Sequence, residues 1–367
     1  MATAIDGRNS EPKRFCIPCA WTARVLTACL GWLFLINCGL AHEIQEAPGK
    51  PQDLTSLSLE TLLHEEITPI NVLGSHTHPK GTFMIGYRYM YMDMDHNQEG
   101  TRDVSQGEVL SRYPVVHTHM TMQMHMAELM YAPSDRITVM AMIPYSDLSM
   151  DHLTSTGTRF TDRSAGIGDV SFMGLFNFLG DAYCRDYCLF LNAGLTAPTG
   201  SIDEGVPGRR FEYAMQLGSG TWNVEPGLTY LGGTKHLAWG AQAMGTIHLG
   251  ENDRNYRLGD GYRLSAWTQL KVTDWFGPSA RLDWHAWGNI HGADPALNPA
   301  RNPAFDPHKQ AGERLDFLGG LNFYVPKGIL KGTRFSVEGG VPIYQNIFGP
   351  NLGVDWMITT GISYTFR

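Results

Sequence analysis

Charged residues are scarce in this sequence, and long apolar runs are almost absent from it. Only 17% of the 367 residues are charged, while 43% are hydrophobic, a balance that excludes an intrinsically disordered chain. After residue 41, no continuous apolar run reaches the roughly 18–20 residues that a membrane-spanning helix needs. The sequence is therefore that of a folded protein without a spanning helix beyond its first 41 residues.

Cysteine and basic residues are also few. The net charge is −8, which gives no support to a nucleic-acid partner, because such a partner requires a basic face. Of the six cysteines, only Cys184 and Cys188 lie beyond residue 41. They bound the stretch CRDYC and could form a disulfide across a turn in an oxidising compartment. Metal binding by these two cysteines alone is the alternative.

The first 41 residues predict a secretory signal peptide. The basic residues Lys13, Arg14 and Arg24 precede the apolar run VLTACLGWLFLINCGLA, which ends at Ala41. A basic start, an apolar run and small residues at its end are typical of a signal that is cleaved. A transmembrane anchor is the alternative, although the run is short for one. We expect cleavage after Ala41.

From Gly81 onward, apolar and polar residues alternate with the period of two that is typical of a half-buried β-strand. At the C-terminus, for example, Trp356, Ile358 and Phe366 share one face of DWMITTGISYTFR. Each alternating segment is near the 9–11 residues that a tilted strand needs to cross a bilayer, or somewhat longer. The twelve segments are 82–93, 117–131, 136–148, 168–179, 186–197, 221–231, 236–249, 259–273, 276–290, 312–325, 333–344 and 353–367.

The connections between these segments alternate between short and long. The short ones are APSD, GDAYCRD, GGTK, DW and PKGILKG, and the others are mostly longer and rich in Gly, Asp, Asn and Pro. Short periplasmic turns and longer outer loops are typical of outer-membrane β-barrels. A soluble β-sandwich, the alternative, does not explain this alternation. It also leaves unexplained the aromatic alternation that ends at Phe366, which resembles the recognition signal for barrel insertion.

The predicted fold is all-β, a transmembrane antiparallel up-and-down β-barrel of about twelve strands in the bacterial outer membrane. Residues 1–41 are the predicted signal peptide, residues 42–80 a short N-terminal periplasmic segment, and residues 81–367 the barrel. In the periplasmic segment, the apolar residues of SLSLETLLHEEI recur at helical spacing and predict a short amphipathic helix. The expected partners are outer-membrane lipid and the barrel-insertion machinery.

Several stretches resemble a known family. MQLGSGTWNVEPGLTYLGG, LTAPTGS and GIGDVSF are similar to outer-membrane proteins of the phenol meta-cleavage-pathway family, over most of residues 74–367. GSHTHPKG and YRYMYMDMD resemble a His- and Met-rich branch of that family. Because its members are usually described as transporters, the resemblance implies an outer-membrane barrel and transport. It implies no catalytic residue and identifies no cargo.

The alternation predicts which side chains point out of the barrel. We expect Tyr87, Trp284 and Phe317 to face outward. Their neighbours Arg88, His285 and Asp316 should face the lumen.

The stretch HTHMTMQMHM, residues 117–126, divides between the two faces of one strand. Lipid gives an imidazole ring no hydrogen-bond partner, so we expect His119, Gln123 and His125 to face the lumen and the four methionines to contact lipid. Methionines of the neighbouring strands would then flank the histidines, a ligand set suited to a soft ion such as Cu(I). The predicted metal residues are His117, His119, His125, Met90, Met92, Met140 and Met142.

The predicted lumen also carries charged residues and tryptophans. These charges could be structural ion pairs or a selectivity device, and the tryptophans could stack a flat solute or fill space. The predicted lumen-lining residues are Arg88, Gln123, Glu225, Arg263, Trp267, Arg281, Asp283, His285, Trp287, Arg314 and Asp316.

The predicted function is a channel for small, hydrophobic or aromatic solutes. One alternative is a copper-handling barrel that uses the His and Met residues, and another is a structural barrel without transport. An enzyme is not predicted, because no strand combines Ser and His on the lipid-facing rim as barrel-wall hydrolases require. Apart from copper, we predict no cofactor. The sequence leaves open the cargo, its direction and the oligomeric state.

Overall fold

The computed structural model describes residue 72, residues 76–180, residue 184 and residues 187–366. The predicted signal peptide and the predicted helix that follows it lie outside the described residues.

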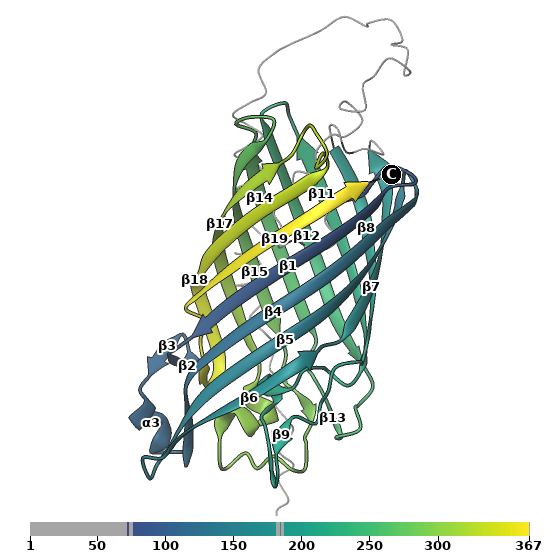
Figure 1. The fold of residues 1–367 in the computed structure, drawn as a ribbon. Helices are drawn as coiled ribbons and strands as arrows, with labels where there is room; N and C mark the ends of the chain where they lie inside the picture. The colour runs from purple at the N-terminus through teal and green to yellow at the C-terminus, as the bar shows by residue number, and fades with distance from the viewer. Residues whose placement is uncertain (1–71, 73–75, 181–183, 185–186, 367) are drawn as a thin grey trace, which may run out of the picture. The chain divides into compact units, whose positions relative to one another are not determined.

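Twelve antiparallel strands form one closed ring, shown in Figure 1. Each strand pairs with the next one along the chain, and the first pairs with the last in an unbroken register from Phe83↔Phe366 to Asp93↔Trp356. The predicted twelve-stranded antiparallel barrel is therefore confirmed. The strands are β1 (Phe83–Met94), β4 (Val115–Ser134), β5 (Ile137–Thr154), β7 (Val170–Gly180), β8 (Tyr187–Ala197), β11 (Trp222–Gly233), β12 (Leu237–Leu249), β14 (Gly261–Leu270), β15 (Phe276–Trp287), β17 (Gly312–Tyr324), β18 (Thr333–Leu352) and β19 (Trp356–Phe366).

The alternating pattern determines which side chains face outward. Tyr87 and Phe317 are 44% and 48% exposed on the outer surface, whereas their neighbours Arg88 and Asp316 are 3% and 1% exposed. A transmembrane barrel needs this arrangement, because an unpaired polar group in lipid costs several kcal/mol, on the order of 2–7. The predicted faces of β1 and β17 are confirmed.

Strand β15 follows the same rule. Asp283 is buried inside the ring, and Nε2 of His285 lies 3.0 Å from its Oδ2 atom. Trp284, between them in sequence, lies on the opposite, outer face. The predicted faces of His285 and Trp284 are therefore confirmed as well.

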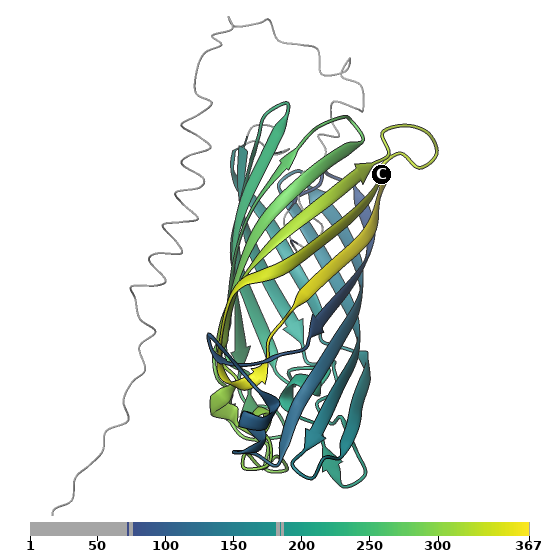
Figure 2. The same cartoon turned by 90° about the vertical axis from the view of Figure 1, so that its left-hand side faces the viewer.

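Short turns and long loops segregate to opposite ends of the barrel, as Figures 1 and 2 show, with the loops at the lower end. Stacked aromatic side chains surround the turn end, among them Phe83, Tyr131 and Phe366. Such a girdle is typical of the membrane interface of outer-membrane barrels. The loop end carries the smaller elements: β2 (Asn97–Gly100), β3 (Arg102–Val104), α3 (Gln106–Leu110), β6 (Arg159–Ile167), β9 (Gly205–Val206), β10 (Arg209–Arg210), η1 (Tyr213–Met215), β13 (Tyr256–Arg257), β16 (His291–Gly292), η2 (Pro303–Phe305) and η3 (Pro307–Lys309).

Three strands are longer than predicted. Strands β4, β5 and β18 extend past the ring at the loop end, where β4 pairs only with β5 beyond the pair Met94↔Met120. The extension of β5 in turn pairs with β6. On β4 the sequence alternation ends at a β-bulge between His117 and His119, which shifts its register against β5. Residues at the loop end are therefore held in paired strands.

A disulfide joins Cys184, in the turn between β7 and β8, to Cys188 at the start of β8. Of the two alternatives for these cysteines, the structure therefore has the disulfide and not the two-cysteine metal site. The short helix α3 begins at Ser105, whose side chain accepts a hydrogen bond from the backbone N–H of Glu108. In the described part of the chain, no helix is long and apolar enough to cross a membrane.

Candidate functional site: the barrel interior and its capped mouth

Strand β4 turns its methionines inward, opposite to the prediction. Met122 pairs with Met92 and Met124 pairs with Met90, and directly paired residues share one face of a sheet. Met84 lies on that same face and is 3% exposed, so the face is the interior. The prediction that the four methionines of HTHMTMQMHM contact lipid is therefore wrong.

His119, Gln123 and His125 lie on the outer face, and their predicted place in the lumen is wrong. Each has a hydrogen-bonding partner on β1. The pairs are Tyr87 Oη with His125 Nδ1 at 2.6 Å, Tyr89 Oη with Gln123 Oε1 at 2.9 Å, and Asp93 Oδ2 with His119 Nε2 at 3.1 Å.

The error has a physical cause. The prediction assumed that no partner exists on the lipid side, but the tyrosine column of β1 supplies hydroxyl groups there. Toward the loop end, the outer face is also polar on both neighbours, where Thr121 lies between Asp93 and Ser149. This part of β4 therefore lies beyond the band of apolar side chains by which the outer surface of the barrel contacts lipid, here called the apolar band. The sequence did contain a usable signal for the orientation of β4. The methionines of β1 were predicted to face inward, and strand pairing places the methionines of β4 beside them.

All sixteen methionines of the described residues face the interior. Fifteen lie on barrel strands, and Met215 lies on a loop folded into the mouth. Twelve of them occupy three adjacent strands, β1, β4 and β5, and we call these twelve the methionine wall. They are Met84, Met90, Met92, Met94, Met120, Met122, Met124, Met126, Met130, Met140, Met142 and Met150.

Charged side chains cover the inner face on the other side of the ring. Strand β14 lies six strands from β4 in either direction. Arg281, with a fully buried side chain, binds Asp283 and also Glu338, the latter at 2.8 Å. Arg263 binds Asp283 at 2.6 Å. We call these residues, with His285 and the pair Arg314–Asp316, the charged wall.

The other predicted lumen residues also face inward. Arg88 forms an ion pair with Glu128 on the methionine wall. Glu225 accepts a hydrogen bond from Thr196 at 2.8 Å. Trp267 is buried, and its ring occupies the space that a side chain on Gly240 would need.

Gln123 is thus the one predicted lumen residue on the wrong face. Trp287, also inside, donates a hydrogen bond to the Gln310 carbonyl at 2.7 Å. Of the predicted metal residues, the four methionines and His117 are inside, whereas His119 and His125 are not. The structure therefore does not bring the predicted set together.

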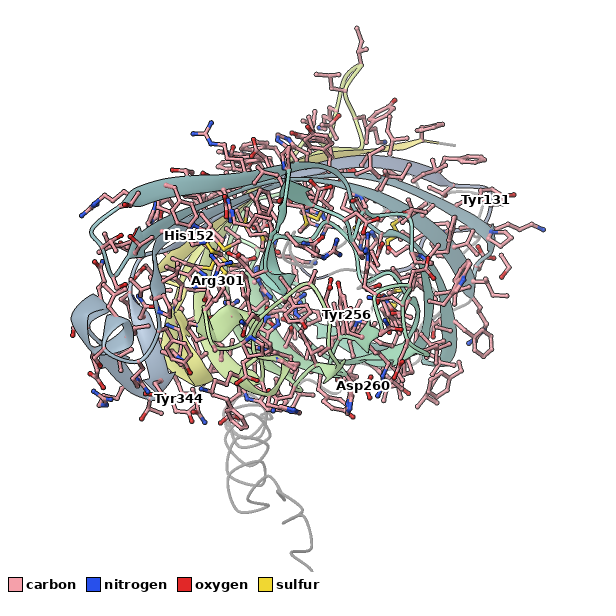
Figure 3. All side chains as sticks on the ribbon, turned by 90° about the horizontal axis from the view of Figure 1, so that it is seen from below. Tyr131, His152, Tyr256, Asp260, Arg301 and Tyr344 are labelled. Atoms are coloured by element: carbon pink, nitrogen blue, oxygen red, sulfur yellow. A yellow bond between two sulfur atoms is a disulfide. The ribbon has the colours of Figure 1, made fainter. Side chains whose placement is uncertain are left out.

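A loop folds into the mouth at the loop end. Residues 198–221, here called the cap, connect β8 to β11 and include η1. Phe211 and Met215 of the cap are buried in an apolar cluster with Met120, Met357 and Leu318, which come from three different strands. In Figure 3, viewed from this end, side chains fill the mouth, with Tyr256 near its middle and His152 beside the wall.

Polar contacts hold the cap in place. Arg209 forms an ion pair with the buried Asp162 of β6. Arg210 forms another with Asp294, which lies in the loop after β15 and is also buried. The hydroxyl of Ser164 donates to the Met215 carbonyl at 2.7 Å. The cap is therefore bound to β6 on one side and to the loop after β15 on the other.

Two histidines and a glutamate lie together where the cap contacts the loop ends of β4 and β5. His117 and His152 are directly paired on β4 and β5, and Glu212 of the cap lies against both. His117 lies beyond the apolar band, and burial of its ring lowers its pKa to about 4, against the attraction of the Glu212 carboxylate. Sequence reasoning missed His152 and Glu212 because both lie in stretches predicted as loops, where alternation gives no signal.

The closed ring, with its apolar outer face, defines a transmembrane β-barrel of the bacterial outer-membrane type. The chain belongs to the family described as "Putative MetA-pathway of phenol degradation", whose model matches residues 116–339. The resemblance found in the sequence is therefore confirmed. No curated protein matches this sequence.

Solved structures of outer-membrane proteins are similar to this chain. An outer-membrane channel from Pseudomonas putida F1 has a TM-score of 0.60 and 16% identity, covering 82% of this chain and 100% of that one. The transport unit of the autotransporter AIDA-I from Escherichia coli has a TM-score of 0.42 and 12% identity, covering 80% of this chain and 93% of that one. A Pseudomonas aeruginosa FadL homologue has a TM-score of 0.38 and 10% identity, covering 79% of this chain and 90% of that one. The first of these likenesses supports the barrel fold.

Proposed function

We propose that this barrel passes small hydrophobic or aromatic solutes across the bacterial outer membrane. The observation that carries the proposal is the methionine wall. Transmembrane barrels ordinarily have polar interiors, whereas here three adjacent strands present thioethers to the bore. Methionine is flexible and polarisable, adapts to irregular apolar shapes and makes favourable contacts with aromatic rings.

The charged wall refines the proposed solute. A molecule in the bore would meet thioethers on one side and paired charges such as Arg263–Asp283 on the other. A ring that carries a polar group, as in a phenol or an aromatic acid, matches both walls. The family description, which names phenol degradation, agrees with this solute class. The proposal requires no catalytic residue.

Flux into liposomes tests this proposal. We expect the purified barrel to pass ionised benzoate faster than a sugar of similar size. Changing Met92, Met122 and Met124 together to Gln should lower the benzoate flux by about tenfold. The amides make this part of the wall polar, burial of apolar area is worth about 25 cal/mol per Å², and 1.4 kcal/mol is about a factor of ten.

The matched control changes the same three methionines to Leu, which keeps the wall apolar and should keep most of the flux. Equal benzoate flux through the Gln and Leu variants would refute the role of the wall. If wild-type liposomes admit no solute, the barrel is structural rather than a channel.

Passage of a soft metal ion is a second candidate function. The specific observation is that methionines face one another across strand pairs, as Met92 does with Met122 and with Met357. Thioethers suit Cu(I) and Ag(I). The predicted ligand pair His119 and His125 takes no part, because both lie outside.

Silver titration separates the two candidates. If the wall binds soft ions, the Leu variant of Met92, Met122 and Met124 should lose Ag(I) affinity by at least about tenfold, because leucine has no sulfur lone pair. Changing the outward His119 and His125 to Ala should leave Ag(I) binding intact. A Leu variant that binds Ag(I) like the wild type eliminates this candidate.

A further inference from the structure

The contact of the cap with the loop ends of β4 and β5 brings together three side chains, from distant segments, of the kinds that bind metal ions. His117 comes from β4, His152 from β5 and Glu212 from the cap. Each is at most 2% exposed, and one ligand atom from each lies within 4.8 Å of the others. None of them belongs to the methionine wall or the charged wall.

Two of the three separations are close to the edges of a metal coordination sphere, and the third is at most 4.8 Å. Oε1 of Glu212 lies 3.5 Å from Nε2 of His117 and 3.3 Å from Nε2 of His152. A tetrahedral Zn²⁺ ion with bonds of about 2.0–2.1 Å has ligand–ligand edges of about 3.3–3.4 Å. Charge-assisted hydrogen bonds are shorter, about 2.7–2.9 Å.

The hydrogen bonds place two acceptor atoms next to each other, Nε2 of His117 and Oε1 of Glu212. Asn302 accepts a hydrogen bond from the Ala304 N–H through its side-chain oxygen, so its amide nitrogen must point at Nε2 of His117, 2.9 Å away. Nε2 therefore accepts this hydrogen bond through its single lone pair and offers no hydrogen to the Glu212 oxygen beside it. A cation bound by that lone pair in place of the amide would satisfy the oxygen as well.

Two further buried atoms of this cluster lack a hydrogen-bond partner within the described residues. They are Nδ1 of His152 and Oε2 of Glu212. The nearby Asp162 binds Arg209 through both of its oxygens, and its contact with His152 is at Nε2, 3.9 Å away, rather than at Nδ1. Buried polar groups without partners are rare in native proteins, and a bound ion or water can satisfy them.

We propose that His117, His152 and Glu212 bind a first-row divalent transition-metal ion, with Zn²⁺ as its representative. Two imidazoles and one carboxylate are a ligand set typical of Zn²⁺ sites with an open fourth position. The amide of Asn302 would give up the lone pair of His117 to the metal. The bound ion would join the cap to β4 and β5. This inference is independent of the solute that passes through the bore.

Metal titration of the full chain, purified without a polyhistidine tag, tests the site. We expect wild-type protein to take up one Zn²⁺ per chain in competition with a chromophoric chelator. His152→Gln and Glu212→Gln keep the side-chain volume and polarity, and each should weaken Zn²⁺ binding by at least about a hundredfold. Loss of a mere outer-shell partner already costs about 10–100-fold. The matched control, His119→Gln with His125→Gln on the outer face of the same strand, should bind Zn²⁺ like the wild type.

A second measurement needs no variant. Co²⁺ bound to the wild type should show the strong visible absorption of a tetrahedral site, which Zn²⁺ then removes. The proposal is overturned if Co²⁺ keeps the spectrum of the hydrated ion, if the wild type binds no Zn²⁺, or if the folded His152 and Glu212 variants bind Zn²⁺ as tightly as the wild type.

Discussion

Changing Arg281 to Ala should lower the free energy of unfolding by about 3–5 kcal/mol. The Arg281 side chain is fully buried between Asp283 and Glu338, whose side chains are 3% and 2% exposed. Removing the guanidinium leaves Glu338 buried without its arginine partner and leaves Asp283 with Arg263, His285 and Ser265. Urea unfolding of the barrel in lipid vesicles, followed by tryptophan fluorescence, measures the change.

A double variant shows whether charge imbalance causes the loss. Changing both Arg281 and Glu338 to Met removes the pair together, and replacing a buried ion pair by apolar residues is often nearly neutral. The double variant should therefore be more stable than Arg281→Ala. Arg159, exposed at the start of β6, is the control, and its change to Ala should alter stability by less than about 0.5 kcal/mol. Equal losses for Arg281→Ala and Arg159→Ala would contradict the structural importance of the charged wall.

Replacing residues 203–216 of the cap by a short Gly-Ser link should raise the ion conductance of the barrel by about fivefold or more. The cap places Phe211 and Met215 among inward side chains of the strands and so fills the mouth. A twelve-stranded ring is intermediate between filled eight-stranded barrels and the open barrels of about 16–18 strands. Single-channel recording in planar bilayers measures the conductance.

Shortening a different loop at the same end provides the control. Residues 155–158 form the turn between β5 and β6. The N–H of Gly157 donates to the Thr154 carbonyl, the N–H of Ser155 donates to the Pro114 carbonyl, and the side chains are exposed. Deleting this turn should leave the conductance unchanged, because it does not reach the mouth. If the cap variant conducts like the wild type, another segment closes the bore.

The strand number and most faces could be predicted because lipid imposes a strict rule on each strand. On β17, Asp316 next to Phe317 leaves only one acceptable orientation, and the same holds for Arg88 next to Tyr87. The alternation of short and long connections then indicated a barrel rather than a sandwich. These features depend on local sequence and on the solvent at each face, and both can be inferred from a single chain.

Strand β4 shows where such reasoning fails. Its two faces carry methionine on one side and His, Thr and Gln on the other, and the rule that polar groups avoid lipid favoured the wrong side. The orientation depends on neighbours, since Tyr87 and Tyr89 supply hydroxyls to His125 and Gln123. Pairing partners are a property of the folded sheet, so one strand considered alone cannot reveal them.

The cluster of His117, His152 and Glu212 could not be predicted for a different reason. His152 and Glu212 are 60 residues apart in sequence, and Glu212 lies in an irregular loop. Only the folding of the cap into the mouth brings the Glu212 carboxylate to β4 and β5. Sequence periodicity carries no information about such loop packing.

The pairing of β1 with β19 has a consequence for how this chain can fold. The two strands share eleven residue pairs, and the backbone groups on the edge that each turns to the other would be unpaired in lipid if the other were absent. Each unsatisfied group there costs several kcal/mol, on the order of 2–7, whereas a folded domain is stable by only about 5–15 kcal/mol. The cost of an open edge in lipid is thus comparable with the whole stability of a folded domain. We therefore expect the membrane insertion of this protein to be all-or-none, because the closing pair of strands forms only when the last strand is present.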